Sequence, residues 1–245
     1  MKKTSEAGVT LIEILIAVSL LSLLSVGMLV AMRLGFNTMD KTDKRLVADR
    51  RVSNSRQIIE NEITGFYSTM AYYHRTPLET RGLPFLQDEP QTMRFVTAYS
   101  IDDGWRGRPR IAALQVIPGE KSEGVRLIVN ETVYTGPEQA GQLIREIEQI
   151  PERAAIVHYA PVEAGPQSFV LADRLAYCRF VYLERQNVPP FEVWRPERLF
   201  PQLYPLAVRI EMAPLDPKQN ELHISTVTVP FHINGPPGTA YADPQ

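Results

Sequence analysis

The longest apolar run of the chain extends from Val9 to Met32 and contains a single charged residue, Glu13. A helix that rises ~1.5 Å per residue over this run is about 36 Å long, which exceeds the roughly 30 Å of hydrocarbon in a bilayer. The pattern therefore predicts a membrane-spanning helix over residues 9–32.

Helical spacing continues after this run. Residues 33–70 contain no proline, and only Gly35 and Gly65 interrupt good helix formers. Apolar residues recur at spacings that are mostly three, four or seven, as one buried stripe requires. They are Leu46, Val52, Ile59, Ile63 and Phe66. We therefore expect an amphipathic continuation of the helix over 33–70, with the charged residues between Asp40 and Arg51 on the opposite face.

Beyond His74 the pattern changes to short apolar segments bounded by turn residues, which is typical of strands. We expect strands over Met93–Tyr99, Ile111–Ile117, Gly124–Tyr134 (one strand or a pair), Arg153–Tyr159, Leu206–Met212 and His223–Phe231. Helical spacing of isoleucine and leucine predicts a short amphipathic helix over Glu138–Ile150, between two prolines. Prolines and small polar residues predict a disordered tail over 235–245.

The two C-terminal strands show the clearest alternation. Leu206, Val208, Ile210 and Met212 share one face of the first, and the second, His223–Phe231, alternates likewise. Such strands are half-buried and antiparallel, packed on a helix or a second sheet. With the long helix before them, they predict an α+β fold with an antiparallel β-rich head over residues 71–234.

The acid inside the apolar run needs a partner. A carboxylate at the bilayer centre costs about 2.5–3.5 kcal/mol on insertion scales. No basic residue lies between Val9 and Met32. The candidate counter-charge is the free α-amino group that a cut after Gly8 creates, in this subunit or in a neighbour.

Residues 1–8 support such a cut. The segment is short, carries Lys2 and Lys3, and ends in Gly8. A secretory signal peptide is cleaved after its apolar region, whereas the only plausible site here precedes it. Cleavage after Gly8 leaves the membrane helix attached, with Val9 as the new N-terminus.

The run Gly8-Val9-Thr10-Leu11-Ile12-Glu13 resembles the class III leader of type IV pilins and pseudopilins. The resemblance implies a pilin-like fold, cleavage after Gly8 by a prepilin peptidase, and methylation of the new amine on Val9. It also implies that Glu13, the fifth mature residue, guides docking into a filament. Val9 departs from the pattern, because phenylalanine is the usual first mature residue. The alternative is an ordinary single-span anchor that carries a stray acid.

Two features leave alternatives open. The charged face of residues 40–51 is either a solvated surface or a contact with neighbouring subunits in a filament. Lysines and arginines also follow the span more densely than they precede it, which by count alone places the C-terminal side in the cytoplasm. The leader motif instead implies a head in the periplasm, and long soluble domains translocate largely regardless of charge.

The second half of the chain resembles one branch of the family, the J-type minor pseudopilins of type II secretion. The resemblance rests on three stretches: Phe169–Leu183, Phe191–Trp194 and Tyr204–Ile210. Tyr204-Pro205 replaces the Leu-Pro of that branch. We expect Tyr182 and Trp194 to be aromatic core residues.

This resemblance implies a single-pass protein of the bacterial inner membrane that joins a short pseudopilus near its tip. The implied partners are the I-, K- and H-type minor pseudopilins, the major pseudopilin and the prepilin peptidase. A minor pilin of a type IV pilus or DNA-uptake pilus is a close alternative. A membrane-tethered periplasmic binding module or enzyme is an alternative from a different class.

Composition restricts other functions. The net charge is −2 and the pI is near 6.1, so no global basic field recruits nucleic acid. Cys178 is the only cysteine, which excludes an intrachain disulfide, and its apolar surroundings indicate a buried thiol rather than a reactive one.

Catalytic and metal-binding patterns are absent from the sequence. The four histidines have no zinc-ligand spacing, and neither a GxSxG elbow nor a phosphate-binding loop occurs. Asp102-Asp103 and Asp216 with Glu221 are either calcium ligands or, as we expect, solvated turn acids. Trp105 among Arg106, Arg108 and Arg110 either stacks on nucleic acid or forms an exposed loop. We predict no enzymatic activity, no metal, no cofactor and no nucleic-acid partner.

Overall fold

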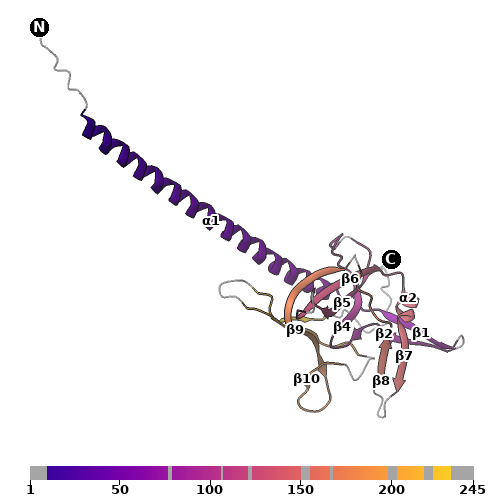
Figure 1. The fold of residues 1–245 in the computed structure, drawn as a ribbon. Helices are drawn as coiled ribbons and strands as arrows, with labels where there is room; N and C mark the ends of the chain where they lie inside the picture. The colour runs from indigo at the N-terminus through magenta and orange to yellow at the C-terminus, as the bar shows by residue number, and fades with distance from the viewer. Residues whose placement is uncertain are drawn as a thin grey trace, which may run out of the picture. The chain divides into compact units, whose positions relative to one another are not determined.

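The computed structural model describes residues 10–76, 79–105, 107–120, 123–149, 155–165, 168–197, 203–217 and 223–232 (Figure 1). The chain divides into two compact units, Met1–Asp49 and Arg50–Gln245. The predicted cleavage position at Gly8 and Val9 and the predicted tail over 235–245 lie outside the described residues.

The first unit consists of the N-terminal part of helix α1 (Leu11–Thr64), which is exposed from its start to residue 48. Its length and composition allow it to cross a membrane once. The hydroxyl groups of Ser19, Ser22 and Ser25 donate to the carbonyl oxygens four residues earlier, at 2.6–2.8 Å. These bonds satisfy the three serine hydroxyl groups within the helix, as a hydrocarbon environment requires.

The helix ends earlier than the sequence pattern indicates. We expected it to reach about Met70, but it ends at Thr64 and Met70 begins a strand. Gly65 causes the early end by closely approaching the end of strand β4 (Thr92–Thr97), where its carbonyl accepts a hydrogen bond from Ala98 N. A Cβ at this position would lie 2.6 Å from Thr97 Oγ1, so only glycine permits the approach.

Within the described residues, eight strands form one antiparallel sheet in the second unit. Its order is β12-β11-β9-β6-β5-β4-β3, and β10 pairs with the end of β9. The strands not yet bounded are β3 (Gln87–Asp88), β5 (Arg110–Pro118), β6 (Val125–Val133), β9 (Phe169–Arg185), β10 (Glu192–Arg195), β11 (Ala207–Pro214) and β12 (Val227–Pro230).

One face of this sheet packs on the C-terminal part of α1. Ile59 and Ile63 are fully buried there and belong to one cluster with Phe95, Leu114 and Leu127. Each such side chain contributes about 1.5–3 kcal/mol through burial. The observed fold class is therefore α+β, a long N-terminal helix packed on an antiparallel β-rich region, as the sequence predicts.

The opposite face carries a second, smaller cluster. It is covered by two hairpin sheets and a short helix (Figure 1): β1 (Met70–Thr76) with β2 (Glu79–Pro84), β7 (Ile144–Gln149) with β8 (Ala155–Tyr159), and α2 (Pro137–Gln142). Because both faces are covered, strand β4 is buried almost continuously and shows no alternation, although it lies next to edge strand β3.

The predicted helix over Glu138–Ile150 is wrong. Only Pro137–Gln142 is helical, and Ile144–Gln149 forms strand β7. A β-bulge between Ile144 and Glu146 shifts the register of the strand. Ile144 and Ile147 consequently both face the second cluster although they are three residues apart, which imitates helical spacing.

Candidate processing and assembly site

Glu13 lies in the first turn of α1. Its backbone N–H donates to Thr10 O at 3.0 Å, and Ile14 N donates to the same oxygen at 3.3 Å. An acid in a first turn interacts favourably with the helix dipole, by about 0.3–1 kcal/mol. This contribution offsets only part of the cost of placing a carboxylate among apolar side chains.

The surroundings of Glu13 are open. The neighbouring Ile12 and Ile14 are 68% and 55% exposed, and the side chain of Glu13 is exposed as well. Within α1, this carboxylate is therefore exposed on the helix surface. The Glu13 carboxylate can accept a hydrogen bond from another chain and can form an ion pair with a positively charged group of that chain.

Two of the candidate calcium ligands, Asp103 and Asp216, are engaged with arginines. Asp103 accepts from Arg110 at 2.9 Å, and Asp216 accepts from Arg174 at 2.8 Å. Glu221 lies outside the described residues. In the part of the chain that the structure describes, no cluster of three or more His, Cys, Asp or Glu side chains could hold a metal.

Trp105 and Arg110 of the basic-aromatic cluster also contact other residues of the protein. Trp105 is 56% exposed and contacts Tyr99 edge-on, with ring centroids 5.3 Å apart. Arg110 makes ion pairs with Asp103 and Glu131. The side chain of Arg110 is therefore committed to the protein rather than to an exposed basic surface.

The two predicted core aromatics differ. Tyr182 is fully buried in β9, as expected. The prediction that Trp194 is a core residue is wrong. Trp194 is only partly buried, and the guanidinium of Arg209 lies 3.9 Å from the centroid of its ring. β10 pairs only with the last residues of β9, where Trp194 lies opposite Leu183, which is also only partly buried.

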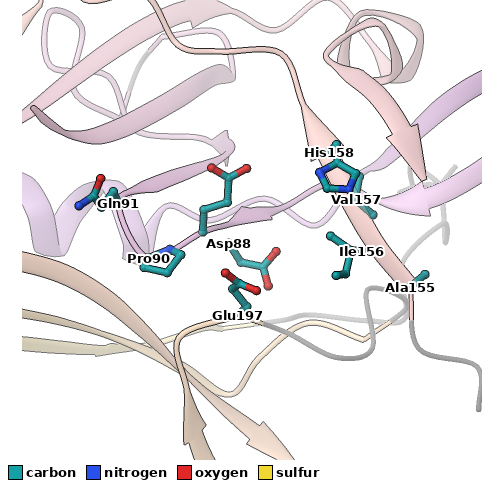
Figure 2. Close-up of a pocket in the computed structure, with 9 residues that line it drawn as sticks. Asp88, Pro90, Gln91, Ala155, Ile156, Val157, His158 and Glu197 are labelled. Atoms are coloured by element: carbon teal, nitrogen blue, oxygen red, sulfur yellow. The ribbon is translucent and has the colours of Figure 1, made fainter. Parts of the chain in front are cut away.

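A cavity of about 620 Å³ lies between the β3–β4 turn and strand β8. In Figure 2, Asp88 and Glu197 lie between these two elements. His158 also lines the cavity, and its Nε2 lies 3.4 Å from Glu148 Oε2. The described lining includes no Ser, Thr, Cys, Lys or Tyr. It therefore offers carboxylates and an imidazole but no side-chain nucleophile for them to activate.

One buried group was missed by the sequence analysis. Glu62 is 0% exposed, on the face of α1 that also buries Ile59 and Ile63. Burial, together with the neighbouring carboxyl of Glu131, raises the pKa of Glu62 to about 10. Its spacing of three from Ile59 places it on the apolar stripe, and this signal could have identified it.

The fold and the N-terminal segment together define an α+β protein whose long apolar helix fits a single-pass membrane anchor. Residues 3–29 match the family model of the prokaryotic N-terminal methylation motif. The match covers part of the leader, Glu13 and most of the apolar run, and it supports a type IV pilin-like protein. Proteins of this kind are in general structural rather than enzymatic. Neither a curated protein nor a solved structure matches this chain.

Proposed function

We propose that this chain is a minor pseudopilin of a type II secretion system. Prepilin peptidase removes residues 1–8 and methylates the amine of Val9. The mature chain waits in the bacterial inner membrane, with residues 71–234 in the periplasm, until it joins a pseudopilus at or near its tip. The growing pseudopilus then drives export of folded proteins, and an ATPase elsewhere in the system supplies the energy.

The observation that carries the proposal is the acid in the matched segment. Glu13 lies in an otherwise uncharged apolar helix that continues to Met32, inside residues that match the methylation motif. A neighbour's free N-terminus supplies the charge that this carboxylate lacks in its own chain. Pairing of the two removes the cost of a lone charge in the membrane and fixes the axial position of each subunit.

The proposed parts of the chain follow from this assignment. Residues 1–8 are the leader, 9–32 the transmembrane and assembly helix, and 33–70 the amphipathic segment. Residues 71–234 form the head, and 235–245 the tail. The amphipathic segment includes the charged residues 40–51, which meet neighbouring subunits in the pseudopilus.

The placement in the J-type branch is supported by the second half of the chain. The three stretches that carry the resemblance fall on β9, on β10 and on the start of β11. Both β10 and β11 pair with β9, so the three stretches adjoin in one part of the sheet. The proposed partners are the I-, K- and H-type minor pseudopilins and the major pseudopilin.

Replacement of Glu13 tests the role in assembly. We expect Glu13→Ala to be inserted in the membrane at wild-type levels and to be lost from sheared or cross-linked pseudopilus fractions. The matched control is Glu163→Ala, which removes an exposed acid of the head and is expected to assemble normally. Wild-type incorporation of Glu13→Ala contradicts the proposed role of the acid.

Co-purification tests the secretion system itself. The full-length protein, solubilised in mild detergent, is expected to retain the I- and K-type minor pseudopilins of the same host. Association with minor pilins of a pilus or DNA-uptake system instead assigns the chain to the alternative. A chain that binds neither group, and functions equally well without leader cleavage, is a membrane-tethered module.

A further inference from the structure

The end of α1 buries an acid against the sheet. Glu62 is fully buried, as are Ile59 and Ile63 on the same face of the helix. Among the described residues, no N–H, hydroxyl or cationic donor reaches either oxygen of the Glu62 carboxyl. An ionised carboxylate without donors costs several kcal/mol in such a site, so the neutral form is strongly favoured.

The carboxyl group that interacts with Glu62 is that of Glu131 on β6, and it already accepts hydrogen bonds from other groups. Its Oε1 accepts from Ile101 N at 2.7 Å, and its Oε2 accepts from Ser100 Oγ at 3.0 Å. Arg110 Nε lies 3.5 Å from Oε2. Glu131 is therefore supplied with donors and a positive charge, whereas Glu62 has neither.

Beyond burial, the side chain of Glu131 also raises the pKa of Glu62, so the two carboxyl groups interact. A proton shared by the two groups cannot be assigned to Glu131, because Glu131 already accepts from Ile101 N and Ser100 Oγ and lies beside Arg110. That proton must reside on Glu62, which then donates to Glu131. The burial of Glu62 acts in the same direction, since it disfavours ionisation of the buried partner.

The main chain of Glu62 is fixed as well. Thr97 Oγ1, fully buried on β4, donates to Glu62 O at 2.9 Å. The side chain and the backbone of one residue thus attach the last turns of α1 to two strands of the sheet. Both attachments lie within the second unit of the chain.

We propose that Glu62 and Glu131 form a proton-sharing carboxyl pair that fastens the end of α1 to the head and loosens when Glu62 loses its proton. The charged groups that act on Glu62 are Glu131 from β6 and Arg110 from β5, and Asp103 acts through its ion pair with Arg110.

The direction of the pH dependence follows from the position of the proton. The folded chain keeps the Glu62 proton, whereas the unfolded chain releases it above pH 4.5 or so, the ordinary value for a glutamic acid. The stability from this pair is therefore complete below pH 4.5 and declines as the pH rises toward 10. Each pH unit within this window raises the unfolding constant by up to about tenfold.

The test uses the full-length protein in detergent micelles and two readouts. Infrared difference spectra report the C=O stretch of a buried protonated carboxyl, and urea unfolding at pH 5–9 reports stability. We expect wild type to show the band at pH 7 and to lose stability across this range. Glu62→Gln keeps an amide donor toward Glu131 but cannot titrate, so it should lack the band. Its unfolding should release about one proton fewer, so its free energy of unfolding should depend less on pH.

Two further variants keep the test decisive. Glu60→Gln removes the acid that pairs with Arg56 on the same helix, and it should leave both the band and the pH dependence unchanged. Glu131→Gln removes the negative charge beside Glu62, so the band should titrate at a lower pH than in wild type. The proposal is overturned if wild type lacks the band at pH 7, or if Glu62→Gln and wild type have the same pH dependence. Neither outcome bears on the assembly role of Glu13.

Discussion

Cys178 is a single residue whose chemistry is set by its place in the fold. It lies in β9 opposite Met212 of β11 and is 5% exposed. Burial raises the pKa of its thiol to about 12, from an ordinary value of 9.0. Because the thiolate is the reactive species, its population at pH 8 falls by about 1,000-fold.

Alkylation kinetics measure this effect. With iodoacetamide at pH 8, we expect Cys178 in the folded protein to react about 1,000-fold more slowly than in urea. Its protection should weaken as the pH rises toward 12, since the folded chain favours the neutral thiol. A native chain that reacts at the rate of the unfolded one would show that this position is not buried.

Two acids of α1 show what the sequence can reveal about a site. Glu13 was found because it interrupts an apolar run, a purely local signal. Glu62 lies on a helical stripe that is evident in the sequence, yet it was overlooked because its partner, Glu131, is remote in sequence and comes near only through the sheet. Identifying such a pair requires knowing that β6 lies under the end of α1.

Among the secondary-structure elements, the C-terminal part of α1 fixes the hydrophobic core. We expect Ile63→Ala to destabilise the head by about 2–5 kcal/mol, because Ile63 is fully buried in the main cluster. Urea unfolding followed by tryptophan fluorescence measures the change. Leu46→Ala, at a position 48% exposed, is the control and should stay within about 0.5 kcal/mol. Equal effects of the two substitutions would mean that Ile63 does not anchor the helix.

The elements differ in how readily the sequence reveals them. Strands β11 and β12 were predicted because their buried and exposed residues alternate, and the structure pairs them in antiparallel fashion. The β1–β2 hairpin was missed because its residues are mostly exposed and polar. Strand β7 was mistaken for a helix because a bulge altered its spacing. Local patterns thus reveal half-buried strands, whereas bulges and long-range pairings escape them.

The charged face of α1 carries an ion pair within the helix itself. Lys44 and Asp40 form an ion pair at 2.7 Å with side chains 75% and 65% exposed. A pair of this kind stabilises a helix by about 0.3–0.5 kcal/mol and needs no partner chain. Contact with neighbouring subunits is a prediction of the proposed assembly, beyond this intrachain role.

For the chain as a whole, one apolar helix precedes a head that buries its own core. Two candidate metal ligands of the head, Asp103 and Asp216, are paired with arginines instead. The acid at the other end, Glu13, has no such partner in the described part of its own chain. The function we propose therefore depends on a positive charge that arises by processing.

The identity of the first residue of the chain in its native membrane is the most direct test of the proposed assembly. Mass spectrometry of the protein purified at native levels should find Val9 as the first residue, carrying one added methyl group. Gly8→Ala should instead retain Met1. A native chain that keeps residues 1–8 would remove the counter-charge for Glu13 and contradict the proposed assembly.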